Sequence, residues 1–260
     1  MTELLDRFLK YVKIDTQSAY GQTVVPSTEK QRDIAAVLAD ELRALGAECA
    51  AVSESGCVYG KIPANCEGAP SIGFSAHLDT SPDLSGKDVK PRIVKNYDGG
   101  DVTLNEELGV VLSPENFPHM KNYKGWDLVV TDGTTLLGAD DKAGLAEIMT
   151  MAQYFHDNPG EKHGEIQFFF PTDEEIGCLG AKTLDKNLFN PKFAYTLDGG
   201  AVIARVAEVV TPSDEDWKTA APQITDAVLN AKREQMFRGF LSLLRSNAKI
   251  ELKNETILAD

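Results

Sequence analysis

Histidine and carboxylate residues recur at four places in this chain of 260 residues, each close to the end of a strand-like run. The places are residues 75–79 (SAHLD), 138–144 (GADDKAG), 172–177 (TDEEIG) and 197–200 (LDGG). Their candidate site residues are His77, Asp140, Glu174, Glu175 and Asp198. An imidazole with carboxylates and no thiolate suits Zn²⁺, Mn²⁺ or Co²⁺ in a catalytic rather than a structural site. The pattern therefore predicts a catalytic metal centre.

The elements that must position these residues follow from hydrophobic periodicity. Helical spacing predicts three helices. One lies near the N-terminus, a second runs from a capping box at Thr28 and Gln31 to a stop at Gly46, and a third covers residues 143–156. Strands are predicted over residues 48–53, 57–62, 71–77, 128–131, 165–170 and 193–197. This order indicates an α/β fold, in which ligands bind at the carboxyl ends of the strands. The candidate residues fall at those ends.

Two stretches do not follow this alternation. Residues 80–126 are rich in Pro, Gly, Asn and Asp, and they are predicted to form long surface loops with at most a small hairpin. Residues 201–210 are apolar and strand-like, and a long helical pattern with a kink at Pro222 follows them. We expect two units, namely residues 1–200 with the metal site and a strand–helix tail over residues 201–260.

Composition excludes several partners. The formal charge of −14 and a pI near 4.7 argue against nucleic acid, because its binders need basic surfaces. The N-terminus lacks a signal-peptide pattern and no window is apolar enough for a membrane span, so we expect no membrane partner and a cytoplasmic location. Four scattered cysteines without ligand spacing are expected to be reduced thiols.

Each motif also has a purely structural interpretation. A single histidine in a strand is more often a hydrogen-bonded structural residue than a metal ligand. Asp140 and Asp141 are suited to capping the following helix, with one of them expected to cap and to bind. Residues 173–175 are compatible with a solvated acidic loop, and residues 198–200 alone indicate only a turn.

Longer strings resemble the M20 family of metallopeptidases. They are residues 15–18 (DTQS), 26–29 (PSTE), 77–83 (HLDTSPD) and 135–144 (TLLGADDKAG). The resemblance runs from about residue 4 to residue 200 and is strongest to the tripeptide aminopeptidases of the family. It implies part of a zinc-peptidase catalytic domain, a mixed sheet flanked by helices, that lacks the dimerisation domain of the family.

The resemblance also implies roles for individual residues. It assigns one zinc to His77, Asp140 and Asp198, and a second to the bridging Asp140 with Glu175. Glu174 becomes the general base and acid, and Asp79 orients His77. The peptide bond between Asp140 and Asp141 is expected to be cis, as is typical of the family.

Physical chemistry is consistent with these roles. Asp79 lies two residues beyond His77, so on extended backbone it shares a face with the histidine and can accept the imidazole N–H. Glu174 and Glu175 are adjacent, so their side chains diverge, and one can bind metal while the other transfers protons. Two metals about 3.5–4 Å apart need a bridging carboxylate, and Asp140 is the candidate.

The resemblance ends after residue 200. The second zinc of the family takes a histidine from a C-terminal half, and this chain has no histidine beyond His163. The tail over residues 201–260 faintly resembles the C-terminus of SurA-like or PpiD-like chaperone isomerases, so we expect a fused or truncated peptidase.

Two function classes stay open. The first is a zinc aminopeptidase that releases the N-terminal residue from tripeptides, with activity impaired by the missing half. The second is a noncatalytic metal-binding or interaction protein that uses the tail helix to bind a partner. Short peptides are the expected ligands of the first class, and the sequence does not predict an oligomeric state.

Overall fold

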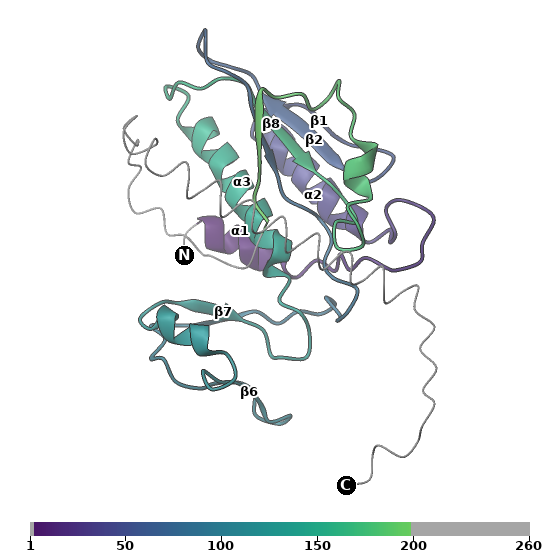
Figure 1. Cartoon of the computed structure of the whole chain (residues 1–260). Coiled ribbons are helices and arrows are strands. Elements are labelled where there is room, and N and C mark those ends of the chain that lie inside the picture. Colours follow the sequence, from purple (N-terminus) through teal and green to yellow (C-terminus); the bar gives the residue numbers. More distant parts are fainter. Residues whose placement is uncertain (1–2, 199–260) are drawn as a thin grey trace. The chain divides into compact units, whose positions relative to one another are not determined.

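A mixed five-stranded sheet forms the centre of the computed structural model, which describes residues 3–198 (Figure 1). Its strands are β1 (Glu48–Val52), β2 (Val58–Ile62), β8 (Ile166–Phe170), β3 (Ile72–Ser75) and β9 (Phe193–Thr196), in that spatial order. The first two pairings, β1 with β2 and β2 with β8, are antiparallel. β3 lies parallel to both β8 and β9. The predicted α/β class and mixed sheet are confirmed.

The carboxyl ends of β8, β3 and β9 meet at one edge of the sheet. Their register pairs Ser75 of β3 with Phe169 of β8 on one side and with Thr196 of β9 on the other. Because parallel strands end together, the residues that follow these three strands come to the same edge. Three of the four motifs predicted from sequence are the continuations of these strands.

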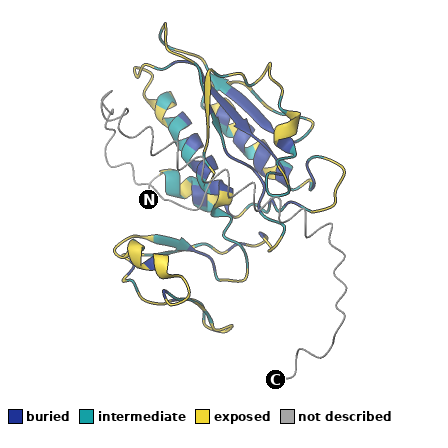
Figure 2. Cartoon of the chain, viewed as in Figure 1, coloured by how far each residue is buried: buried dark blue, intermediate teal, exposed yellow. Residues whose placement is uncertain are grey.

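Helices pack on one face of this sheet through a shared apolar core. They are α1 (Glu3–Tyr11), α2 (Gln31–Ala44) and α3 (Ala139–Asp157). Alternate residues of β8, Phe168 and Phe170, point into this core with Leu38 of α2 and Ile148 of α3. Figure 2 shows β8, most of β2 and the inner sides of the helices as buried, whereas the residues of β9 are exposed. Burying each such side chain stabilises the fold by about 1.5–3 kcal/mol, so the core fixes the positions of the strand ends.

The opposite face of the sheet has a smaller core. Tyr59 of β2 and Phe169 of β8 point to this side, where Leu184 and Phe189 cover them. The covering segment includes the 3₁₀ helix η2 (Gly180–Thr183) and leads into β9. The chain between the acidic motif and Asp198 is therefore held against the sheet.

One strand predicted for the main sheet lies elsewhere. β7 (Leu128–Val130) pairs with β4 (Arg92–Val94) in a separate two-stranded sheet. The prediction that Asp140 follows a strand end is wrong, because residue 140 lies ten positions beyond β7, at the start of α3. A short apolar run does not reveal which partner strand it pairs with.

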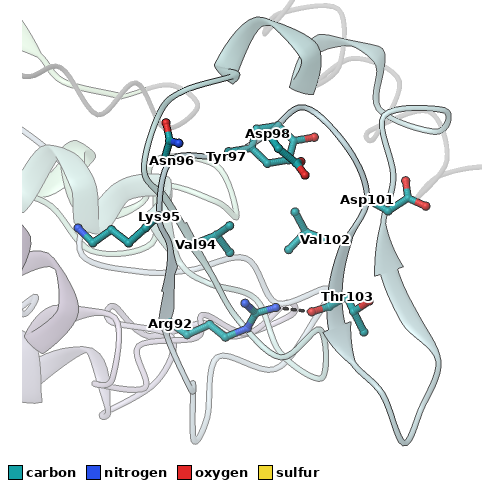
Figure 3. A pocket seen from close by; sticks show the side chains of 9 residues that line it. All are labelled: Arg92, Val94, Lys95, Asn96, Tyr97, Asp98, Asp101, Val102 and Thr103. Carbon is teal, nitrogen blue, oxygen red and sulfur yellow. Dashed lines mark hydrogen bonds between the residues drawn. The ribbon is translucent and has the colours of Figure 1, made fainter.

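Residues 80–126 contain more structure than loops alone. The predicted small hairpin is present as β5 (Val102–Asn105) and β6 (Val110–Leu112), followed by the 3₁₀ helix η1 (Pro118–Tyr123). Figure 3 shows a pocket of about 320 Å³ beside β4 and β5, where the Arg92 guanidinium donates to the carbonyl oxygen of Thr103. None of the residues that line it is a candidate ligand.

The predicted capping box of α2 is absent. The Thr28 hydroxyl donates to the carbonyl oxygen of Gln17, and α2 begins at Gln31 without a side-chain cap. The Gln31 side chain instead extends toward Asp173, because that buried carboxylate needs donors. Gly46, at φ +79°, ends the helix as predicted.

The predicted tail, with its strand over 201–210 and its helix, lies outside the described residues. The division into residues 1–200 and 201–260 therefore stays a prediction. Over residues 3–198, no helix has the length and apolarity needed to span a membrane.

Candidate metal centre

His77 lies just beyond β3, where its ring is almost completely buried, with 2% of its surface exposed. Its Nδ1 lies 2.9 Å from the backbone oxygen of Asp79, and its Nε2 lies 2.9 Å from Oδ1 of Asp140. A carbonyl oxygen only accepts, so Nδ1 carries the proton. Nε2 is therefore the nitrogen that faces the acidic side chains and is able to bind a cation.

Two groups of potential ligand atoms share His77. One consists of His77, Glu174 and Asp198, and the other of His77, Asp140 and Glu175, with the ligand atoms of each group within 4.8 Å of one another. All five residues predicted from sequence are brought together. The grouping differs from the expected one, in which Asp140 and Asp198 share a cation and Glu174 binds none. Asp140 has half of its side chain exposed, so small rotations of this group change its partners.

Asp79 connects the histidine to the acidic pair. Its carboxylate is fully buried and accepts the backbone N–H of Glu174 at 2.8 Å and that of Glu175 at 3.2 Å. The imidazole N–H is closer to the backbone oxygen of Asp79 than to its carboxylate, which lies 3.5 Å away. The predicted contact with His77 is therefore made mainly by the Asp79 backbone, while the side chain holds the Glu174–Glu175 loop.

Asp140 and Asp141 were both considered for helix capping and for metal binding, and their contacts differ. The peptide bond between them is cis, as the family resemblance implies. The Asp141 carboxylate accepts the N–H of Gly144 at 3.2 Å, so it caps the regular part of α3, and it also accepts the N–H of His77 at 3.1 Å. Asp140 carries the contact with the His77 ring. Asp141 thus has a structural role, and Asp140 is the one of the two that lies among the candidate ligands.

Crowding of acidic groups dominates the electrostatics of the site. Burial raises the pKa of Glu175 to about 7 and that of Asp141 to about 8. Burial also raises the pKa of Glu174 and of Asp198. Burial alone would lower the pKa of His77, but hydrogen bonds to Asp140 and Asp79 outweigh it and raise that pKa well above its usual value. Neighbouring carboxylates thus favour a positive charge at the position of the ring.

The donor set fits a divalent cation. Carboxylates from Asp140, Glu174, Glu175 and Asp198 surround one imidazole, so negative charge exceeds the positive charge that His77 supplies. Like charges at this separation cannot all ionise without a compensating cation. Nitrogen and oxygen donors without thiolate suit Zn²⁺, Mn²⁺ and Co²⁺ alike. The remaining histidines, His119, His156 and His163, belong to neither group.

Three residues near the site were given no functional role from the sequence. Gln31 and Asp173 form a buried pair directly before Glu174, and the Cys178 thiol donates to Oε1 of Glu174 at 3.4 Å. Cys178 is one of four cysteines, and all of them lie in the described part of the chain without a disulfide. The sequence indicated only that Cys178 lies near the site, because it follows Glu174 by four residues. It gave no indication for Gln31, because the partner of Gln31 lies 142 positions away.

Comparison with known sequences identifies relatives. A peptidase T from Alkaliphilus oremlandii is 51% identical over 205 residues, which cover 78% of this chain and 50% of the relative. A peptidase T from Clostridium botulinum (strain Langeland) is 42% identical over 274 positions, covering 96% of this chain and 67% of the relative. The chain spans about half the length of the relatives that it matches over about 200 residues.

Solved structures give the same result for the fold. An aminopeptidase PepT from Bacillus cereus matches with a TM-score of 0.54 and 26% identity over 76% of this chain and 43% of that one. A tripeptidase from Staphylococcus aureus matches with the same TM-score and identity over 77% of this chain and 44% of that one.

The sequence model of Peptidase family M28 matches residues 58–237. This match and the Clostridium alignment extend beyond residue 200, into residues where no family motif was recognised. The motif strings resemble family M20, and the tripeptide aminopeptidases they point to agree with the relatives named peptidase T. The chain therefore belongs to Peptidase family M28 as that model defines it, with peptidase T sequences as its relatives.

Proposed function

We propose that this chain carries the metal-binding half of a zinc-dependent aminopeptidase that releases the N-terminal residue from tripeptides. The observation that carries the proposal is the His77 ring, buried at the edge of the sheet, which forms two candidate ligand groups with two carboxylates each. The names of the relatives, peptidase T and a tripeptidase, support short peptides as substrates. A cytoplasmic location, expected from the composition, is part of the same proposal.

In this proposal His77, Asp140 and Asp198 would hold one zinc, and Asp140 and Glu175 would hold a second. When bound at such a site, a divalent cation lowers the pKa of water toward about 7 and polarises a carbonyl group. The protein keeps these ligands in place through Asp79, whose carboxylate holds the backbone of Glu174 and Glu175. It keeps bulk water from the histidine by burying the ring.

Glu174 would take the proton from the attacking water at a carboxylate oxygen and deliver it to the leaving amine. Its Oε2 lies 3.9 Å from Nε2 of His77, and the Cys178 thiol donates to Oε1. Burial raises the pKa of Glu174, which brings this carboxyl group closer to the neutral pH at which it must both accept and donate a proton.

A noncatalytic metal-binding function is the second candidate. Within residues 3–198, both possible ligand groups use the same histidine, so only one of them can have an imidazole. A second cation would be held by carboxylates alone and would bind more weakly. If it stays unbound, we expect the chain to bind one metal and to turn over peptides slowly.

The proposal is tested by assaying tripeptide hydrolysis in the presence of Zn²⁺ or Co²⁺. We expect Glu174→Ala to lower kcat by about 10²–10⁴-fold, the usual contribution of a general base, while metal is still bound. Glu147→Ala, which removes a half-buried glutamate of α3 outside the site, is the matched control and should keep its activity. Equal rates for the wild type and Glu174→Ala would refute the role of Glu174. If the wild type hydrolyses no tripeptide at any metal loading, the catalytic function is refuted and the noncatalytic metal-binding function remains.

A further inference from the structure

Three consecutive backbone N–H groups in the acidic loop, those of residues 173–175, donate to side-chain oxygens from distant parts of the chain. Those of Glu174 and Glu175 bond to the Asp79 carboxylate. That of Asp173 bonds to Oε1 of Gln31 at 3.1 Å. The backbone that carries the proposed base and one proposed ligand is therefore fixed from two sides, by the segment that follows β3 and by the first residue of α2.

Both polar atoms of the Gln31 side-chain amide bond to Asp173. Its Nε2 donates to Oδ1 of Asp173 at 2.6 Å, while its Oε1 accepts the N–H of the same residue. A backbone N–H only donates, so this pairing defines which amide atom is oxygen. Gln31 and Asp173 are both completely buried. Buried amides and carboxylates without such partners are strongly destabilising, so the pair is held in one arrangement.

Asp173 receives two further bonds from the loop before α2. The backbone N–H of Ser27 donates to Oδ2 at 2.7 Å, and the Ser27 hydroxyl donates to Oδ1 at 2.6 Å. Asp173 itself has φ +55°, in the left-handed region that residues other than glycine rarely adopt. Surrounding contacts must maintain such a conformation, and it sets the direction in which the chain continues to Glu174.

We propose that Gln31, acting through Asp173, is a positioning residue that sets the placement of Glu174 and Glu175. The inference rests on the proposed function, because it assumes that these glutamates are the base and a metal ligand. Gln31 does not touch the site itself. Its loss should therefore lower kcat and metal affinity through the loop, with little change in KM.

The test compares Gln31→Leu with Gln167→Leu. Gln167 is a matched control, because it is also buried and its amide also accepts a backbone N–H, that of Asn190, and donates to carboxylate and amide oxygens outside the site. We expect similar losses of Tm in both variants. Only Gln31→Leu should lower kcat on a tripeptide, by about 10–100-fold, and weaken Co²⁺ binding by a similar factor. Equal effects of the two variants on kcat and on Co²⁺ affinity would overturn the inference.

Exchanging the amide and the carboxylate between residues 31 and 173 tests whether their pairing restores activity. In the double variant Gln31→Glu with Asp173→Asn, the new carboxylate can accept both the side-chain N–H and the backbone N–H of residue 173, so the pairing with residue 31 is restored with the negative charge moved to residue 31. The remaining amide oxygen can still accept the backbone N–H of Ser27, while the Ser27 hydroxyl loses its bond to Oδ1. We expect the double variant to recover kcat and Co²⁺ affinity relative to either single variant. Recovery of Tm without recovery of either would contradict a positioning role.

Amide hydrogen exchange separates this inference from the proposed function. If the wild type hydrolyses no peptide and binds no Co²⁺, the proposed function fails, but the loop can still be measured. Amides of residues 173–175 should exchange slowly in the wild type and in Gln167→Leu, and at least tenfold faster in Gln31→Leu. Unchanged protection in Gln31→Leu would overturn the positioning role whatever the activity.

Discussion

The protonation of His77 follows from its neighbours. Nδ1 is committed to the backbone oxygen of Asp79, and Nε2 lies 2.9 Å from the Asp140 carboxylate. Both nitrogens are therefore protonated in the metal-free protein, in accord with the raised pKa of His77. A cation that binds Nε2 must displace its proton, so metal binding competes with protons at this ring.

Asp79→Asn tests the link between the histidine and the acidic pair. An amide group has one oxygen and one N–H₂, so it cannot accept both backbone N–H groups that the carboxylate accepts. One buried donor is left without a partner, and we expect a loss of about 1–3 kcal/mol in the free energy of unfolding. Zinc affinity should fall by about 10–100-fold, because the support of the ligands is weakened.

Chemical denaturation of Asp79→Asn measures the loss in the free energy of unfolding, and zinc titration measures the loss of zinc affinity. Asp83→Asn is a suitable control, because Asp83 lies in the same stretch of chain and is exposed. Wild-type zinc affinity in Asp79→Asn would show that its carboxylate has no part in holding the site.

Residue types at the site were predictable, and their partners were not. His77, Asp140, Glu174, Glu175 and Asp198 stand out because imidazole and carboxylate groups recur after strand-like runs. The contact between Asp173 and Gln31 depends on how α2 packs beside the sheet, and local sequence carries no information on that packing. The same limit explains why Asp79 was expected to contact His77 through its carboxylate rather than through its backbone.

At the scale of elements, α3 comes close to the segment that follows β9 and carries Asp198. Gly144 lies at this contact, where an added Cβ would come within 2.5 Å of the backbone oxygen of Leu197 and of the Asp141 carboxylate. A backbone oxygen cannot move without shifting its strand. Glycine at this position therefore permits the close approach of α3 to the segment that carries Asp198.

Gly144→Ala should separate α3 from β9. We expect a loss of about 1–3 kcal/mol in the free energy of unfolding, as for other overpacked sites, and weaker zinc binding. Gly160→Ala is the control, because its added Cβ would meet no atom within 4 Å. Thermal unfolding with and without Zn²⁺ measures both effects. Identical stabilisation by Zn²⁺ in Gly144→Ala and in the wild type would contradict the role of this contact.

Element types were predicted better than their arrangement. Five of the six predicted strands form the main sheet, because alternating or continuous apolar runs mark buried strands. β7 was misplaced, since its pairing with β4 depends on a distant segment that looked like a loop. α3 extends from Ala139, but Asp140 and Asp141 have non-helical backbone angles, so its regular part begins after them, close to the predicted residue 143.

At the scale of the whole molecule, the chain has a net charge of −14, and burial raises the pKa of several of its carboxyl groups. Asp141 and Glu175 have folded-state pKa values of about 8 and about 7, above the ordinary 3.8 and 4.5. Protons therefore bind more tightly to the folded state. Their stabilising contribution is complete below the ordinary pKa values and is lost as the pH rises through about 7 and about 8.

The metal-free protein should thus be less stable at pH 8 than at pH 5.5. We expect its Tm to fall across this range, and we expect saturating Zn²⁺ to reduce the fall because the cation replaces the protons. Differential scanning calorimetry in EDTA and in Zn²⁺ measures the difference. A metal-free Tm that rises between pH 5.5 and pH 8 would contradict the crowding of buried carboxylates.

The most direct test of the site is a calorimetric titration of the metal-free protein with Zn²⁺, repeated for His77→Ala and for the control His163→Ala. We predict that the wild type and His163→Ala bind at least one Zn²⁺ with release of protons. His77→Ala should bind at least about 100-fold more weakly, because it has lost the one imidazole of both ligand groups within residues 3–198. Zinc binding of equal affinity and stoichiometry in His77→Ala would show that the cation is not held at this edge of the sheet.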